Sequence, residues 1–492
     1  VGHTGEVWSI ALEGDRLVSG SSDQTMKVWD LSKIGTSTLA GEKIYPMLTI
    51  FVSKDDEYVV WTKEGFFNAS KKGAEYIGYH INQGADKEAR YVSVDKLYDT
   101  FYRPDLVAKA LNGEDISSYA KDINIETILK SGLAPRVAIK TNSKYSKKRD
   151  LELELEVCEI DGGGYDNLTL YLNGMAIDVM SKERALKRKR VSKRREDCFT
   201  FNKLISLTNG KNVIDFKATN RAGNIDSNRD SVIFTYKGRS NKKPNLYILA
   251  IGVDRYRDGD LWLKYSKADA KEFTKTISKV SKPLFENIYK TTLLDKEVTK
   301  RNILKTFEDI GRKTTRDDVF MLYVAGHGIT DTKTGAYFYL PVDFRYKSDE
   351  SVRQTGLSQK DFKLALSKIQ AMKSLTILDT CNSGSFAEAM ASRGVLQKTA
   401  INKLTRATGR AIIVASSKDQ VALEGYKGHG VFTYTLVEAL KGKGFGNDNK
   451  ITIKELASYI EDILPDRTYE KWGYEQVPQS NISGNDFPIG VR

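Results

Sequence analysis

Two side chains able to perform nucleophilic chemistry each follow a predicted buried strand in the C-terminal half. His327 lies in the motif YVAGHG after the apolar run 319–324, and Cys381 lies in the motif DTCNSG after the run 375–378. Active groups of α/β sheets lie just beyond the carboxyl ends of strands, so neighbouring strands would bring the two residues to one edge. A base beside a thiol raises its thiolate fraction and makes it a nucleophile. The sequence therefore predicts a His–Cys catalytic pair, with the backbone N–H groups of Gly328 and Cys381 holding the oxyanion.

The order of strand and helix patterns from residue 245 onward predicts the domain that positions this pair. The run 246–253 is almost continuously apolar, which is typical of a parallel strand buried on both faces. Ser358 with Asp361, and Thr452 with Glu455, form capping boxes that mark two helix starts. The alternation predicts an α/β sheet flanked by helices. Further strands are expected over 319–324, 375–378 and 411–415, and helices over 268–277, 303–310, 358–369, 431–440 and 455–463.

The two motifs and the order of several weaker ones resemble the caspase superfamily, and most of all metacaspases and their bacterial relatives. The separation of His327 and Cys381 agrees with the roughly 50 residues between the caspase His and Cys. The resemblance covers nearly all of 245–492 and implies a caspase-like fold, cysteine endopeptidase activity and these two residues as the catalytic pair. The other matching segments are 251–254 with Tyr256, 267–270, 299–303, 340–343, 415–417 and 430–440.

The resemblance also implies a substrate preference. In metacaspases an aspartate two residues before the nucleophile and a second, earlier aspartate line an acidic S1 pocket, and the matching positions here are Asp379 and Asp269. Two carboxylates favour a P1 Arg or Lys through charge-assisted bonds. The alternative is structural, with Asp269 capping a helix turn and Asp379 orienting backbone. His429 is interpreted as a loop residue near the substrate.

Relatives are cleaved between their large and small parts after the nucleophile, in a segment expected to be an exposed basic loop. The resemblance therefore implies self-cleavage near Arg393, Lys398 or Arg406. Some metacaspases are activated by calcium, for which Asp343, Asp349 and Glu350 would be available. No calcium-loop spacing is present, so no metal or cofactor is predicted.

The N-terminal half reads as three further regions. Residues 1–40 resemble a WD40 repeat, in which His3, Asp23 and Trp29 are expected to tie turns to strands. A lone blade needs neighbours to bury its faces, so we expect the end of a propeller. Residues 41–134 resemble the linkers that join WD40 repeats to caspase-like domains, with mixed structure and an aromatic core.

Residues 135–240 alternate apolar and polar side chains, which predicts an immunoglobulin-like β-sandwich. Asn173-Gly174 and Asn209-Gly210 are interpreted as hairpin turns. The basic run 182–195 is interpreted as a solvated, mobile loop. The alternatives are an acidic partner and a loop that the enzyme itself cuts.

Composition limits the remaining choices. The chain has 492 residues, a net charge of +13 and three cysteines. The few cysteines are interpreted as excluding a disulfide framework and as indicating a reducing, cytoplasmic compartment. No apolar run reaches about 18 residues, so no membrane span is predicted. The positive charge is local and no reader fold accompanies it, which makes nucleic acid an unlikely partner. Because Val1 is not Met, a fragment or processed form is expected.

The hypothesis is a bacterial-type cysteine endopeptidase that acts on proteins and is gated by its N-terminal sensor or scaffold modules, which would bind a partner or activator. One alternative is a catalytically silent scaffold or binding protein, against which the intact pair of His327 and Cys381 argues. Another is a peptidase of the type fused to helical repeats in bacterial defence systems. The WD40-like start and the sandwich argue against that second alternative.

Overall fold

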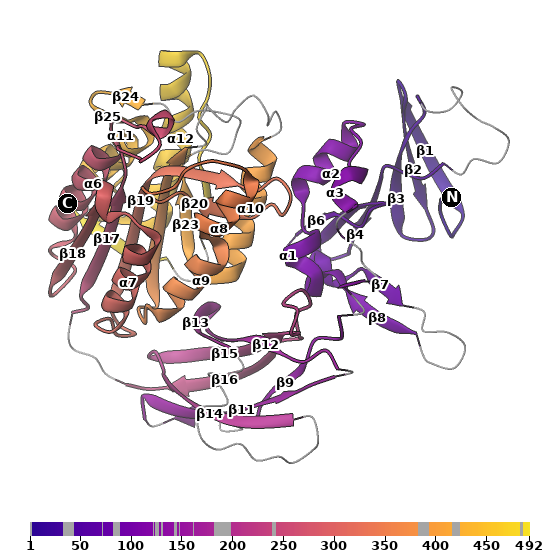
Figure 1. Ribbon diagram of the computed structural model, residues 1–492, viewed down its shortest axis with the longest axis horizontal. Coiled ribbons are helices and arrows are strands. Elements are labelled where there is room, and N and C mark those ends of the chain that lie inside the picture. The colour runs from indigo at the N-terminus through magenta and orange to yellow at the C-terminus, as the bar shows by residue number, and fades with distance from the viewer. Residues whose placement is uncertain are drawn as a thin grey trace. The chain divides into compact units, whose positions relative to one another are not determined.

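The computed structural model (Figure 1) describes most of the chain and divides it into two compact units. Among the helices that it describes, none is both long and apolar enough to cross a membrane. The first unit comprises Val1–Arg136, Glu159–Asp166 and Ala218–Asn228, and the second comprises Val137–Cys158, Asn167–Lys217 and Arg229–Arg492. The described residues are 2–32, 44–70, 72–81, 89–121, 123, 127–128, 131–141, 145–146, 148–160, 162–181, 198–238, 243–381, 393–415, 424–482 and 486–492.

An antiparallel sheet of six strands, paired in chain order, dominates the first unit. The strands are β1 (Val7–Glu13), β2 (Arg16–Ser21), β3 (Thr25–Asp30), β4 (Leu48–Val52), β5 (Tyr58–Thr62) and β6 (Phe67–Ala69). The first three belong to the WD40-like region, and the next three continue the same sheet into the region expected to be a linker. The boundary predicted near residue 40 therefore falls within one sheet. The edge strand β1 exposes the apolar side chains of Trp8, Ile10 and Leu12.

Three polar side chains tie the first turns to the strands as expected. Nδ1 of His3 lies 2.9 Å from Asp23 Oδ2, and Nε2 of the same ring lies 2.8 Å from Ser19 Oγ. The indole Nε1 of Trp29 donates to the same Ser19 hydroxyl at 2.8 Å. These bonds join the segment before β1, strand β2 and the start and end of β3. The structural role of His3, Asp23 and Trp29 is confirmed, and the assignment to a WD40 repeat stays a prediction.

The predicted aromatic core of the first unit is also present. Phe66, Phe67 and Phe101 are almost fully buried, and Tyr98 stacks on Tyr102 with ring centroids 4.2 Å apart. These side chains fill the space between the sheet and short helices. The elements are η1 (Gly73–Glu75), β7 (Gly78–Ile81), β8 (Arg90–Ser93), η2 (Val94–Leu97), α1 (Tyr98–Phe101), α2 (Pro104–Leu111) and α3 (Ser117–Ala120).

Two sheets follow, ordered β14-β11-β9 and β10-β16-β15-β12-β13. Their bounds are β9 Arg136–Ile139, β10 Tyr145–Ser146, β11 Asp150–Cys158, β12 Asp166–Leu172, β13 Met175–Met180, β14 Cys198–Ser206, β15 Gly210–Thr219 and β16 Asp230–Tyr236. Phe201 and Phe216 meet edge to face across the sheets, with centroids 6.2 Å apart. This packing fits the predicted β-sandwich, and its immunoglobulin-like type stays a prediction. The basic run 182–195 lies outside the described residues.

Only one of the two predicted hairpin turns is correct. Asn173 and Gly174 have φ of 50° and 83° and join the antiparallel pair β12 and β13, as a tight turn requires. Asn209-Gly210 instead connects β14 to β15, which belong to different sheets. The prediction of a hairpin there is wrong, because the same turn residues also serve a crossing between sheets.

Two of the three cysteines form a disulfide, contrary to expectation. Cys158 and Cys198 stand directly opposite each other in β11 and β14 and form a disulfide. The expectation that the cysteines exclude disulfides is therefore wrong for this pair, and the reducing compartment inferred from it loses its basis. The sequence could not reveal this, because register alone brings the two residues together across 40 positions.

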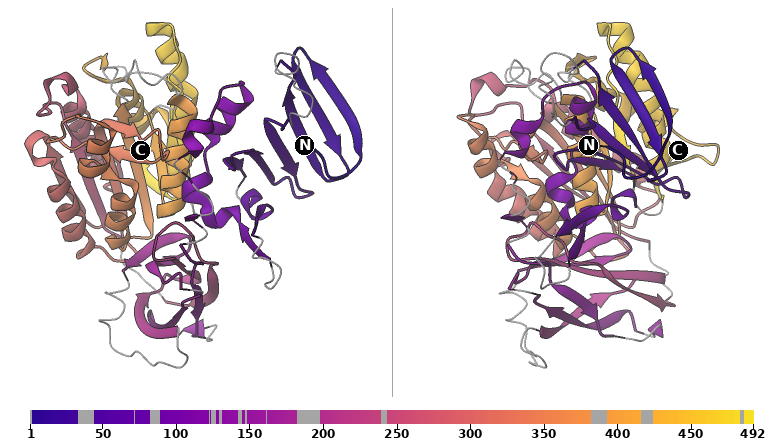
Figure 2. Two further views of the ribbon diagram at one scale, coloured as in Figure 1. Left: turned by 45° about the vertical axis from the view of Figure 1, so that its right-hand side comes forward. Right: turned by 90° about the vertical axis from the view of Figure 1, so that its right-hand side faces the viewer.

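The C-terminal part folds as a central sheet with helices on both faces (Figure 2). Its order is β18-β17-β19-β22-β23-β27, parallel except for β27. The strands are β17 (Leu246–Gly252), β18 (Ile288–Leu294), β19 (Val319–Thr330), β22 (Lys373–Cys381), β23 (Ala411–Val414) and β27 (Gln479–Asn481), with β20 (Tyr337–Tyr339), β21 (Leu357–Ser358), β24 (Glu424–Tyr426), β25 (His429–Gly430), β26 (Lys450–Thr452) and β28 (Pro488–Val491) outside that row.

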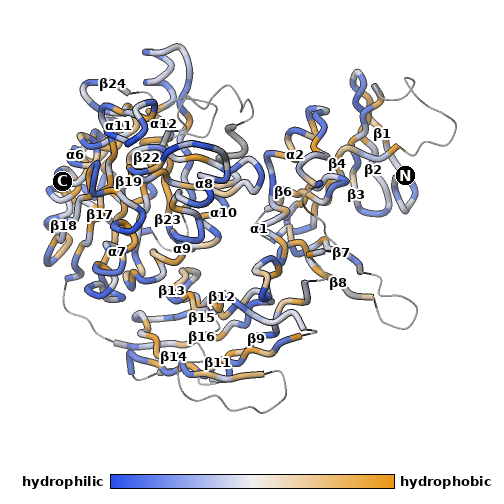
Figure 3. The backbone as a smooth tube through the Cα atoms, viewed as in Figure 1, coloured by the Kyte–Doolittle hydropathy of each residue, from blue (hydrophilic) through white to orange (hydrophobic). Residues whose placement is uncertain are grey.

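Two apolar cores lie on the two faces of this sheet. Helices α7, α9 and α10 contribute to one core, and α6, α11 and α12 contribute to the other. Every residue of β17 is buried, and Figure 3 shows the central strands as largely hydrophobic. The predicted strands, helices and both capping boxes are confirmed. The helices are α6 (Ser266–Ser281), α7 (Lys300–Gly311), α8 (Asp349–Thr355), α9 (Gln359–Lys368), α10 (Arg393–Thr408), α11 (Val431–Glu438) and α12 (Ile453–Trp472), with short turns η3 (Gly259–Leu261), η4 (Asp295–Glu297) and the π-helix η6 (Ala439–Lys443).

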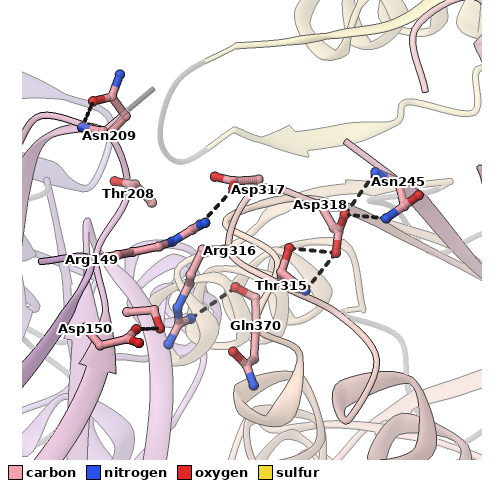
Figure 4. Close-up of polar contacts among 12 residues, drawn as sticks. Arg149, Asp150, Thr208, Asn209, Asn245, Thr315, Arg316, Asp317, Asp318 and Gln370 are labelled. Carbon is pink, nitrogen blue, oxygen red and sulfur yellow. Dashed lines mark hydrogen bonds and ion pairs between the residues drawn. The ribbon is translucent and has the colours of Figure 1, made fainter. Parts of the chain in front are cut away.

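The sandwich contacts the α/β domain at the amino ends of its strands (Figure 4). Arg149, just before β11, pairs with Asp317 at 2.8 Å, and Asp317 lies two residues before β19 begins. Lys363 on α9 donates to Thr169 on β12 at 3.3 Å. The opposite, carboxyl ends of β19 and β22 are the edge where the sequence predicts the active residues.

Candidate active site

The strand register brings the predicted catalytic residues together. β19 and β22 run parallel, and their pairing ends with His327 opposite Cys381. His327 is 3% exposed. The backbone of Cys381 ends β22, whereas its side chain lies outside the described part of the structure. The register thus agrees with the prediction that two neighbouring strands carry these residues to one edge of the sheet.

Two hydrogen bonds, one from the ring and one from the backbone, position His327. Its Nε2 lies 2.9 Å from the carbonyl oxygen of Leu261, which ends the short helix η3. A carbonyl can only accept, so Nε2 carries a proton and the neutral ring presents Nδ1 as its basic atom. The backbone N–H of His327 donates to the Tyr256 hydroxyl at 2.8 Å, and the two rings lie 5.0 Å apart.

Glycines on both sides of His327 make this packing possible. Gly326 has a φ of 146°, and a Cβ there would lie 2.7 Å from the Tyr256 hydroxyl. Gly328 lies opposite Tyr339 of β20 in the antiparallel ladder. The ladder hydrogen bond next to this pair runs from the Leu340 N–H to the His327 carbonyl, so Gly328 and Tyr339 are not hydrogen-bonded to each other. The N–H of Gly328 therefore points away from β20, beyond the last paired residue of β22. That direction suits the oxyanion role predicted for it.

The two aspartates of the predicted S1 pocket also converge. Asp269, on α6, and Asp379, on β22, are 3% and 7% exposed. An ideal Cβ on Gly430 would lie 3.0 Å from Asp269 Oδ2 and 3.5 Å from Asp379 Oδ2, so both carboxylates face one point. Burial and the negative charges of Asp379 and Asp269 raise the pKa of the Tyr323 hydroxyl well above its usual value.

The carboxylate of Asp379 is held by two hydroxyls whose roles the sequence did not predict. Asp379 Oδ2 accepts from the hydroxyls of Tyr323 at 3.2 Å and Thr433 at 2.5 Å. Buried hydroxyls beside a carboxylate carry no pattern in a single sequence, which is why Tyr323 and Thr433 were missed.

His429, interpreted as a loop residue near the substrate, is bonded to this acidic pair. Its Nδ1 lies 2.7 Å from Asp269 Oδ1, and the next residue, Gly430, donates its N–H to Asp269 Oδ2 at 3.0 Å. The hydrogen bond to Asp269 raises the pKa of His429. Asp269 thus binds the segment that begins α11. The alternative that it also caps a turn of its own helix stays a prediction.

The segment predicted as an exposed cleavage loop is largely helical. Arg393, Lys398 and Arg406 all lie within α10, so the loop prediction is wrong for Arg393–Thr408. The side chains of Arg393 and Lys398 lie outside the described part. Cleavage within a helix requires the helix to open first. Self-cleavage at these bonds stays a prediction.

The acidic residues considered for calcium are spread out. Asp343 is exposed, Glu350 pairs with Arg353 at 3.0 Å, and the side chain of Asp349 lies outside the described residues. Within the described ranges, no group of three or more His, Cys, Asp or Glu is arranged to hold a metal.

Comparison with known proteins identifies the domain. Residues 246–486 match the family model described as "Caspase domain". No curated protein matches the chain. Among solved structures, the chain is similar to protein GSU0716 from Geobacter sulfurreducens at 17% identity and a TM-score of 0.35, over 49% of this chain and 94% of that one. Residues 246–486 of the chain thus match a caspase domain, and at the level of the family this match supports a cysteine peptidase domain.

Proposed function

We propose that this caspase domain is a cysteine endopeptidase in which His327 activates Cys381, and that it cuts after Arg or Lys. The observation that carries the proposal is the pairing of the two residues at the carboxyl ends of β19 and β22. The bond from His327 Nε2 to the Leu261 carbonyl supports it, because it leaves Nδ1 as the basic atom.

In the proposed reaction, His327 Nδ1 takes the proton of the Cys381 thiol, and the thiolate attacks the peptide carbonyl carbon. The N–H groups of Gly328 and Cys381 donate to the oxygen as it becomes negative. The tetrahedral intermediate collapses to a thioester, and the amine leaves with the proton from His327. Water then attacks the thioester, again with His327 as the base, and the free thiol returns.

The convergence of Asp269 and Asp379 supports the preference for a basic P1 residue. Both carboxylates are buried and directed toward Gly430, so a guanidinium or ammonium group between them would meet two negative charges. An arginine could bond in a bidentate manner, whereas a lysine would bind as a point charge.

Gating by the N-terminal modules is part of the proposal. The sandwich contacts the caspase domain through Arg149 and Asp317, at the amino end of β19. A protein partner bound to the sandwich would therefore act at the end of β19 opposite His327, and would leave the P1 site open to substrate.

Cleavage of P1-Arg, P1-Lys and P1-Asp reporter peptides tests the proposal. We expect cleavage after Arg or Lys that is lost in Cys381→Ala and falls about a thousandfold in His327→Gln, because general base catalysis contributes about that much. Asp379→Asn should raise KM for P1-Arg while the exposed control Asp462→Asn leaves it unchanged. Cleavage after Asp would refute the acidic pocket. The absence of all cleavage would favour the silent scaffold.

A further inference from the structure

One short segment binds both carboxylates of the proposed P1 site. β25 supplies His429 and Gly430, which bond to the two oxygens of Asp269. Three residues later, Thr433 on α11 donates to Asp379. Of these groups, His429 is the only one in the segment that can carry a positive charge.

The backbone fixes His429 in front of Asp269. The turn between β24 and β25 consists of Lys427 and Gly428, with φ of 50° and 85°. Two residues with positive φ form the tight hairpin turn, which sets the register of Tyr426 opposite His429. The imidazole is 25% exposed at its side chain, so a proton can exchange with solvent.

The other charges around the imidazole largely cancel each other. Glu272, one turn beyond Asp269 on α6, is bonded to Lys441 of η6 at 2.8 Å. The charge that acts on His429 is therefore mainly that of Asp269, whose hydrogen bond raises the pKa of the imidazole. Other groups nearby are Tyr426 on β24, Lys427 in the turn and Tyr434 on α11, of which Lys427 and Tyr434 bond to each other at 3.3 Å. Arg467 on α12 lies over the rings of both tyrosines.

We propose that His429 is a specificity-determining residue of the P1 site, whose imidazolium competes with a basic P1 side chain for Asp269. This inference rests on the proposed preference for Arg or Lys. When His429 is protonated, the positive charge offsets one of the two carboxylates and a guanidinium binds weakly. When His429 loses its proton, both carboxylates act on the substrate.

The expected effect follows from the charge. Removing a positive charge about 6 Å from a bound guanidinium is worth roughly tenfold in affinity at a partly screened site. The Kd of a P1-Arg peptide should therefore fall about tenfold as pH rises through the titration of His429. A P1-citrulline peptide has the same shape without the charge, so its Kd should stay constant.

The test measures binding of both peptides to the Cys381→Ala chain, with and without His429→Asn, across neutral pH. The Asn amide nitrogen can replace Nδ1 as the donor to Asp269 but cannot titrate. We expect the pH dependence for the Arg peptide to vanish in His429→Asn. An equal pH dependence in both chains, or none in the parent, would overturn the inference while leaving the proposed function intact.

Imidazole NMR separates the remaining outcomes, because the chain has only four histidines. Asp269→Asn should lower the pKa of His429, and saturating P1-Arg peptide should lower it too. If the Arg peptide does not bind, the P1 preference fails and the inference fails with it. If it binds without moving the His429 resonance, only the inference fails.

Discussion

The disulfide between β11 and β14 allows a quantitative test. Cys158 and Cys198 are 40 residues apart in sequence. Closing a loop of that size removes chain entropy from the unfolded state worth about 4 kcal/mol. The double variant Cys158→Ser/Cys198→Ser should therefore lower the opening free energy of these strands by up to about 4 kcal/mol.

Hydrogen exchange read out on β11 and β14 measures this locally, which avoids assuming that a chain of several domains unfolds in one step. Exchange there should accelerate by up to about a thousandfold in the double variant, and equally in the parent after reduction. Cys381→Ser is the matched control, since it removes the third cysteine and should leave both rates unchanged. Alkylation of all three thiols in native, unreduced protein would refute the reasoning.

Tyr256→Phe removes the acceptor of the buried His327 N–H, and should lower the free energy of unfolding by about 1–3 kcal/mol and reduce kcat. Arg410→Met should lower the free energy of unfolding by about 1–3 kcal/mol or more, because Arg410 is buried and bonds to the carbonyls that end α9. Chemical denaturation measures the free energy of unfolding of both variants. Burial alone would raise the pKa of Glu438, but hydrogen bonds led by Arg467 lower it to about 2. The parent should therefore exceed Glu438→Gln in free energy of unfolding by the full amount above pH 4.5, and this difference should disappear as pH falls toward 2. Denaturation at several pH values measures the difference.

Each of these three changes has an exposed counterpart of the same chemistry. Tyr469→Phe, Arg312→Met and Glu470→Gln alter exposed side chains, and should leave the free energy of unfolding within about 0.5 kcal/mol of the parent. Equal losses in a buried variant and its control would contradict the assigned bonds. A loss in Glu438→Gln that persists at pH 2 would show that its carboxylate is not the group involved.

Much of the caspase domain could be predicted from local patterns. Apolar runs identified β17, β19 and β22, because strands buried on both faces need continuous apolar side chains. The pairs Ser358–Asp361 and Thr452–Glu455 marked helix starts, since capping acts within four residues of chain. The register of His327 with Cys381 followed from the same strand ends.

The remaining features depend on contacts between distant segments. The Leu261 carbonyl is a backbone group and leaves no trace in residue type. Tyr256 lies 71 positions before its partner His327, and Thr433 lies 54 positions after Asp379. β3 and β4 pair in one sheet although the sequence predicted a domain boundary between them, near residue 40. Such contacts require the tertiary fold.

The two ends of β19 carry separate tasks, and this has a consequence for how the chain can evolve. Asp317, which meets the sandwich, and His327 are joined by a buried strand, about 30 Å apart at the rise of an extended chain. Under the proposed function, substitutions at the amino end would act on the contact with the sandwich, whereas those at the carboxyl end would act on the catalytic pair. If the proposed function holds, the sandwich and the proposed active site can therefore change independently of each other during evolution.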